Sequence, residues 1–162
     1  MKFCIVQITI VILLVGCRNV NSSSDSRKEN FITSQLESSD TLGYRKDKFH
    51  LAENFYLSYD LYNFTGKSQP YSITGSLCDI LIIRGDSIIA SMNRFASLLS
   101  TTWRGTLKSN TGLGAGWLAP LMNGTQCCRL APGDYIVDVK LMIAFDNVEI
   151  QQPEKIKITI LP

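Results

Sequence analysis

Five cysteines and a single histidine have the widest chemical repertoire among the side chains of this 162-residue sequence. Cys4 and Cys17 lie in or directly after an apolar N-terminal run, Cys78 lies among aliphatic residues, and Cys127 and Cys128 are adjacent. Such thiols carry lipids, pair as disulfides, bind zinc or act as nucleophiles. The compartment decides between these roles, because disulfides persist outside the cytosol and are rare within it.

The first 16 residues have the pattern of an export signal. Lys2 is followed by fourteen uncharged residues, Phe3 to Gly16, and then by Cys17. This run suits the apolar core of a signal peptide and is shorter than the roughly 20 residues of a membrane-spanning helix. We therefore predict a signal peptide over residues 1–16 and an exported protein.

The segment Leu14-Val15-Gly16-Cys17 resembles the lipobox of bacterial lipoproteins. The resemblance implies that residues 1–16 are removed and that Cys17 carries a thioether-linked diacylglycerol, with fatty acids such as palmitate. Two or more acyl chains anchor a protein stably to a membrane. The expected location is the bacterial cell envelope, on its periplasmic or surface side. The alternatives are an ordinary secretory signal cut near Gly16 and an uncleaved anchor.

Residues 17–47 are predicted to form the lipid anchor and a flexible, disordered tether. The stretches Asn21 to Asn30 and Glu37 to Asp40 are polar and have short side chains. Such sequence buries too little apolar area to offset the entropy lost on ordering. At most a short helical turn is expected around Phe31, Ile32 and Leu36.

Residues 48–162 are predicted to form one all-β domain, an antiparallel sandwich. Apolar residues alternate in Phe55 to Tyr62, Tyr135 to Phe145 and Lys155 to Ile160, and Cys78 to Ile83 is apolar on both faces, as in a central strand. Turn-forming sequences separate these runs, and no long amphipathic pattern competes with them. A jelly roll or an open barrel is the alternative all-β architecture.

The segment Leu130-Ala131-Pro132-Gly133-Asp134-Tyr135 resembles the tyrosine corner of immunoglobulin-like and fibronectin-type domains. In that motif the Pro-Gly turn precedes a strand, and the tyrosine hydroxyl reaches back to the backbone of the corner. The resemblance implies an immunoglobulin-like sandwich. Asn63 to Lys67, followed by Cys78 to Arg84, is also similar to small domains of the bacterial intracellular-proteinase-inhibitor type.

Three thiols remain in the expected mature domain if Cys17 is lipidated, so at most one disulfide can form among them. Cys78 shares a strand face with Ile80, and adjacent residues such as Cys127 and Cys128 point to opposite faces. A bridge from Cys78 to one member of that pair is our first expectation. A Cys127–Cys128 bridge and three reduced, buried thiols are the alternatives.

The sequence offers little to an enzyme, and we expect a non-catalytic protein without a cofactor or metal. His50 is the only histidine, no Gly-x-Ser-x-Gly turn occurs, and no spacing favours a Cys128–His50 pair. A zinc site needs three or four convergent ligands. The formal net charge is +2 and no basic cluster lines one strand, which argues against nucleic acid as a partner.

Two tryptophans indicate a possible binding loop. Trp103 and Trp117 lie in glycine- and proline-containing sequence that continues through Pro120 and Met122. Aromatic loop residues are common contact points for protein or glycan partners, whereas the alternative role of these tryptophans is to cap the core. The resulting hypothesis is a membrane-anchored, non-catalytic binding or accessory structural domain. A proteinase-inhibitor-like module, tested at Ala115 to Met122, and an envelope enzyme of unknown reaction are the rival hypotheses.

Overall fold

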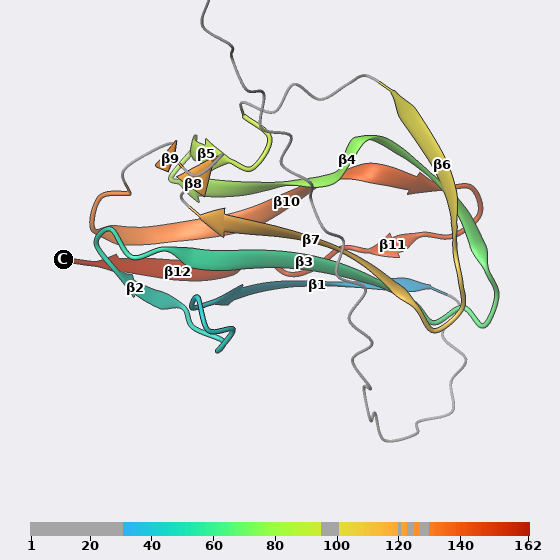
Figure 1. Ribbon diagram of the computed structural model, residues 1–162, viewed down its shortest axis with the longest axis horizontal. Coiled ribbons are helices and arrows are strands. Elements are labelled where there is room, and N and C mark those ends of the chain that lie inside the picture. The colour runs from blue at the N-terminus through green and yellow to red at the C-terminus, as the bar shows by residue number, and fades with distance from the viewer. Residues whose placement is uncertain (1–30, 95–100, 120, 123–124, 127–129) are drawn as a thin grey trace, which may run out of the picture.

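The computed structural model describes residues 31–94, 101–119, 121–122, 125–126 and 130–162. Throughout these residues the regular structure is β-strand (Figure 1), so the all-β prediction is confirmed. The described residues include no helix that is long and apolar enough to cross a membrane. The predicted signal peptide and Cys17 lie outside the described residues.

The first sheet has the strand order β11–β1–β3–β7. Its strands are β1 (Ile32–Ser39), β3 (Phe55–Asn63), β7 (Gly112–Ala119) and β11 (Ile150–Gln151). The β1–β3 and β3–β7 pairs are antiparallel and continuous in register. Tyr59 at the middle of β3 lies between Leu36 of β1 and Ala115 of β7.

The second sheet has the order β2–β12–β10–β4–β5, with β6 paired to a different part of β4. Its strands are β2 (Lys48–His50), β4 (Gln69–Arg84), β5 (Ser87–Ser91), β6 (Thr102–Leu107), β10 (Gly133–Phe145) and β12 (Ile156–Leu161). A separate short hairpin pairs β8 (Leu121–Met122) with β9 (Thr125–Gln126).

Both sheets are mixed, which differs from the purely antiparallel arrangement that we expected. β11 runs parallel to β1, and β2 runs parallel to β12. These added strands have two and three residues and lie at sheet edges. Strands this short carry almost no alternation pattern, so the sequence did not reveal them.

The strand β1 corrects the predicted boundary between tether and domain at residue 48. Ile32, Leu36 and Ser38 are buried against the core, while Gln35 is exposed. The polar residues of this segment occupy the outer face or line the sheet end, so three inward side chains suffice to hold the strand. The folded region therefore begins by Ile32, within the range that we expected to be tether.

The two sheets share one core, built from inward-facing residues at alternate strand positions. On β3 these are Phe55, Leu57, Tyr59, Leu61 and Asn63, all fully buried. On the second sheet they include Cys78, Ile80 and Ile82 of β4, Tyr135 and Val137 of β10, and Ile158 and Ile160 of β12. The alternation predicted for β3, β10 and β12 is thus confirmed.

Asn63 fastens one end of the domain. Its side chain is fully buried and donates to the carbonyl oxygens of Lys67, at 2.8 Å, and Leu107, at 2.9 Å. Its Oδ1 accepts hydrogen bonds from the backbone N–H and the hydroxyl of Thr65, at 3.0 and 2.8 Å. The amide therefore ties the β3–β4 turn to the end of β6, and all of its polar atoms are satisfied, as a buried amide requires.

Candidate binding site

The two tryptophans of the predicted binding loop do not lie on one surface. Trp103 lies on β6, opposite Ile73 of β4, and its side chain is 59% exposed. Trp117 lies on β7 in the other sheet and is only 5% exposed, within the core. Pro120 lies outside the described residues, and only the backbone of Met122, in β8, is described. Trp117 thus takes the alternative role, as a core residue.

Cys78 has a free thiol in the structure and is the one cysteine within the described part of the chain. Burial in the apolar core raises its pKa to about 12, with smaller contributions from Asp79 and Asp60. The thiol is therefore protonated at neutral pH and packs as a small hydrophobic group. This differs from the expected bridge between Cys78 and the Cys127–Cys128 pair, which itself lies outside the described residues.

The tyrosine corner has the local geometry that the sequence predicted. Tyr135 is buried at the start of β10, and its hydroxyl donates to the carbonyl oxygen of Ala131 at 2.7 Å. The guanidinium of Arg84 lies over the Tyr135 ring, 5.5 Å from its centroid. In the turn between Ala131 and Tyr135, Gly133 adopts a φ of +138°, a conformation that glycine tolerates.

Among the described residues, the most exposed large apolar side chains lie on a loop that the sequence pattern did not indicate. Leu42 is 80% exposed and Tyr44 is 70% exposed, both in the connection between β1 and β2. We call residues Asp40 to Arg45 the 40–45 loop. Exposed apolar residues on a surface are informative where they occur together and are held in place, because each costs solvation free energy.

Asp40 holds the 40–45 loop in a defined shape. Its Oδ1 accepts hydrogen bonds from the backbone N–H groups of Leu42 and Tyr44, both at 2.9 Å. Its own backbone N–H donates to the Tyr44 carbonyl at 2.9 Å, and its carbonyl accepts from the Gly43 N–H at 3.0 Å. Gly43 has a φ of +86°, which favours glycine, and Ser39 pairs with Arg45 below the turn.

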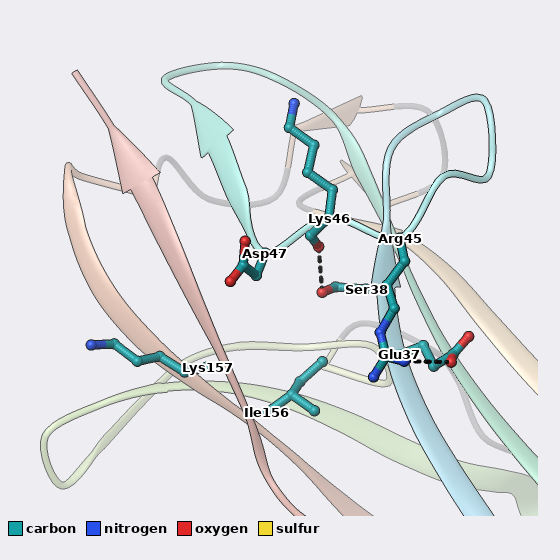
Figure 2. Close-up of a pocket in the computed structure, with 7 residues that line it drawn as sticks. All are labelled: Glu37, Ser38, Arg45, Lys46, Asp47, Ile156 and Lys157. Carbon is teal, nitrogen blue, oxygen red and sulfur yellow. Dashed lines mark hydrogen bonds and ion pairs between the residues drawn. The ribbon is translucent and has the colours of Figure 1, made fainter.

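A polar hollow of about 410 Å³ adjoins the 40–45 loop. Figure 2 shows its lining residues, which come from β1, from the segment 45–47 that ends the 40–45 loop and leads to β2, and from β12: Glu37, Ser38, Arg45, Lys46, Asp47, Ile156 and Lys157. The Ser38 hydroxyl donates to the Lys46 carbonyl at 2.6 Å and fixes the wall to β1. The hollow therefore brings charged groups to the end of the 40–45 loop, where Arg45 follows the exposed Tyr44 in the sequence.

The charges of this region are paired to different degrees. Lys46 Nζ lies 2.5 Å from Glu53 Oε1, and the backbone N–H of His50 donates to Glu53 Oε2 at 2.7 Å. The hydrogen bond from Lys46, aided by the one from His50, lowers the pKa of Glu53. Arg45 is held less closely, because its Nη1 lies 3.6 Å from Glu37 and its side chain is 75% exposed. Arg45 is thus available to a partner's carboxylate at low cost.

On the far wall, Lys157 Nζ lies 2.7 Å from Asp134 Oδ2, and the Thr159 hydroxyl donates to Asp134 Oδ1 at 2.8 Å. These two hydrogen bonds lower the pKa of Asp134. Across the residues that the structure describes, no group of three or more His, Cys, Asp or Glu side chains is placed to hold a metal ion. The arrangement of apolar anchors beside charged groups is suited to contact with another protein.

The 40–45 loop falls within the range predicted to be a flexible tether, so its residues were not identified as candidates. The sequence nevertheless contains a turn pattern at this position. Asp40 precedes Gly43 by three positions, a pattern typical of turns in which a carboxylate accepts backbone N–H groups. The alternation of Ile32, Ser34, Leu36 and Ser38 was the accompanying strand signal. Two of its four inward residues are serines, and this made the segment look like spacer.

No protein-family model matches the sequence, and no curated protein matches it. Among solved structures, the chain is similar to the alkylpurine DNA glycosylase AlkC of Pseudomonas fluorescens bound to DNA containing an abasic site analog. The TM-score is 0.40 and the identity 11%, over 80% of this chain and 30% of that one. It is also similar to a beta-glucosidase from Listeria innocua in complex with gluconolactone, with a TM-score of 0.34 and 9% identity over 78% of this chain and 16% of that one. The chain spans less than a third of either protein, and likeness at this level carries no information about function.

Proposed function

We propose that this chain is a lipid-anchored protein of the bacterial cell envelope whose immunoglobulin-like domain binds another protein, without catalysis, through the 40–45 loop. The observation that carries the proposal is the pair of exposed side chains, Leu42 and Tyr44, on a loop fixed by Asp40. Tyrosine and arginine are enriched among the residues that dominate binding energy, and Tyr44 and Arg45 are neighbours here. A rigid loop loses little conformational entropy on binding.

The strand order supports the immunoglobulin-like part of the proposal. β1, β3 and β7 are adjacent in one sheet, as strands A, B and E are in that fold. β4, β10 and β12 are adjacent in the other sheet, as strands C, F and G are, and the corner tyrosine, Tyr135, lies near the start of β10, the equivalent of strand F. The conserved inter-sheet disulfide of antibody domains has no counterpart on β10, where Val137 occupies its position.

The lipobox-like segment supports the membrane anchor, and the path of β1 gives the binding loop an orientation. Residue 32 begins β1 and Ser39 ends it, so the N-terminal tether and the 40–45 loop join opposite ends of one strand (Figure 1). Eight extended residues span about 27 Å. An anchor at Cys17 would therefore leave the 40–45 loop on the end of the domain away from the tether.

The anchor is tested by growing cells with labelled palmitate. The wild-type chain is expected to take up the label, and the Cys17→Ala chain is expected to remain unlabelled and to keep its signal peptide. Labelling of the Cys17→Ala chain would exclude Cys17 as the attachment point. Trypsin-shaved cells then distinguish the periplasmic side from the surface side.

The binding site is tested by crosslinking the full chain in intact cells. We expect a defined adduct with one envelope protein, lost in the double variant Leu42→Ser/Tyr44→Ser. The matched control is Ile88→Ser, which removes an apolar side chain that is 57% exposed from β5. An adduct that survives the loop variant, or that the control also removes, would refute the 40–45 loop as the binding site.

A proteinase inhibitor is the second candidate, because inhibitors also present exposed side chains on a rigid loop. The segment that the sequence indicated for this test is unsuitable as an inhibitory loop. Its residues Ala115 to Ala119 belong to β7, where Trp117 and Ala119 are buried. The 40–45 loop is the better segment. Inhibition of a chymotrypsin-like protease that Leu42→Ser or Tyr44→Ser abolishes would favour this candidate over a general binding domain.

A further inference from the structure

Among the described residues, no strand pairs with the outer edge of β7. All eight residues of β7 pair with β3 without a register shift, and within the described residues β3 is the only strand that pairs with β7. The sequence Gly112-Leu-Gly-Ala-Gly-Trp-Leu-Ala119 contains no charged residue and no proline. An edge of this kind presents a row of backbone N–H and C=O groups to solvent and is a template for another strand.

The other edge strands of the described structure carry the features that block such pairing. β11 has two residues and β2 has three, of which Lys48 and His50 are exposed. β5 has five residues and directly follows Asp86. β6 has six residues and includes the exposed Arg104. β1 pairs with β11 only at Ile32 and Thr33, and its remaining outer edge carries the charged Glu37. Short strands and charged side chains are the usual protection of sheet edges, so among the described edges β7 is the exception.

The backbone groups and side chains at the outer edge of β7 determine what kind of partner can bind there. Backbone groups spaced along an extended strand are satisfied by another extended strand, which extends the sheet by one strand. Leu113 and Ala115, on the inward face of β7, are only half-buried, so the added strand must also bring apolar side chains. A second β7 supplies both requirements, since it has the same length and the same apolar residues and no charge to repel its copy.

We infer that two copies of this chain associate edge to edge, with β7 of one copy antiparallel to β7 of the other. The pairing is two-fold symmetric, which is the most common symmetry of soluble oligomers. It joins the two first sheets into one continuous sheet and covers Leu113 and Ala115 of each copy with those of its partner. This inference concerns an edge of the domain distant in sequence from the 40–45 loop and does not depend on the proposed function.

Gly116 provides a sharp test of the inference. A Cβ built on Gly116 meets no atom within 4 Å, whereas one on Gly114 lies 2.4 Å from Asp60 Oδ1 and one on Gly112 lies 2.8 Å from the Leu61 carbonyl oxygen. Gly116→Lys therefore adds a charge to the edge strand without a steric clash. Gln35→Lys is the control, because it adds the same charge to an exposed position on β1, a strand of the same sheet that pairs with β3 and not with β7.

The experiment measures the mass of the full chain in detergent by sedimentation, over a range of detergent-to-protein ratios that separates pairing from shared micelles. We expect a dimer for the wild type and for Gln35→Lys, and a dissociation constant raised about tenfold or more for Gly116→Lys. Backbone amide exchange along β7 is expected to rise in Gly116→Lys while the urea midpoint is unchanged. A monomeric wild type, including one with protected β7 amides, would overturn the inference, and so would a Gly116→Lys chain that dimerises as tightly as the wild type.

Discussion

The hydroxyl of Tyr135 donates a hydrogen bond to the carbonyl oxygen of Ala131, with 2.7 Å between the two oxygen atoms. The bond closes the turn that brings the chain into β10, the strand that pairs with both β4 and β12. The ring is buried in the core and Arg84 lies over it, so one side chain fixes the turn and fills the core beneath it. The entry of the chain into the centre of the second sheet thus depends on this residue.

Tyr135→Phe should lower the free energy of unfolding by about 1 kcal/mol. The substitution keeps the buried ring and removes one intramolecular hydrogen bond, whose net contribution is about 0.5–1.5 kcal/mol. Urea unfolding followed by tryptophan fluorescence measures the change. Tyr56→Phe is the control, because Tyr56 is exposed on β3, and an equal loss in both variants would contradict a specific role for the corner.

Asn63→Ala should be more damaging, with a loss of about 2–4 kcal/mol. It removes four side-chain hydrogen bonds at a fully buried position and takes the Asn63 donor from the Leu107 carbonyl, while the Lys67 carbonyl keeps only the Thr65 hydroxyl as a side-chain donor. The exposed Asn147 provides a matched substitution, Asn147→Ala, which should change stability by less than about 0.5 kcal/mol. Similar losses at the two positions would show that Asn63 does not fasten this end of the domain.

The stability of the domain should fall in alkaline solution. Burial raises the pKa of Cys78 from 9.0 to about 12 and that of Tyr59 from 10.0 to about 12. Between these values the unfolded chain loses protons that the folded chain retains, so the free energy of unfolding decreases as the pH rises. The contribution is complete below about pH 9 and is lost as the pH approaches about 12. Urea midpoints at about pH 8 and about pH 10.5 measure this fall, and equal midpoints would contradict it.

The variant Tyr59→Phe separates the contribution of Tyr59 to this alkaline loss of stability from the contribution of Cys78. Within the described residues, the buried Tyr59 hydroxyl has no hydrogen-bond partner. The hydroxyl of Ser34, which donates to the Gln151 carbonyl, lies near it and acts against the rise of its pKa. Removing an unsatisfied buried hydroxyl should leave stability at neutral pH unchanged or raise it by about 1 kcal/mol. The variant should also show a smaller alkaline fall than the wild type. A marked loss at neutral pH would mean that the hydroxyl has a partner.

The strands with strongly alternating apolar residues were the part of the fold that could be predicted from the sequence. β3, β10 and β12 alternate cleanly, and the Pro132-Gly133 turn before Tyr135 identified the corner, because these signals lie within a few neighbouring residues. β1 was missed because Ser34 and Ser38 occupy inward positions, where serine does not register as apolar. Its burial depends on partners on β3 and β11 that are distant along the chain.

The binding site was less predictable than the fold, because exposure is a property of the assembled domain. Trp103 and Trp117 look alike in sequence, and only the assignment of one to β6 and the other to β7 separates an exposed ring from a core residue. In the sequence, Leu42 and Tyr44 are isolated apolar residues within a polar stretch and do not stand out as candidate binding residues. Their significance arises from the hydrogen bonds of Asp40, which hold them outward.

Asp40→Ala should loosen the 40–45 loop and weaken partner binding without unfolding the domain. The change removes the carboxylate oxygen that accepts the N–H groups of Leu42 and Tyr44, while the exposed loop contributes little to the core. We expect faster backbone amide exchange at both N–H groups and about a tenfold fall in affinity, the equivalent of about 1.4 kcal/mol of ordering cost. Asp40→Asn keeps an acceptor oxygen at the same position and should behave like the wild type. Unchanged exchange at Leu42 and Tyr44 in Asp40→Ala would show that Asp40 does not hold the loop, and faster exchange with unchanged binding would show that the loop's shape is not what the partner recognises.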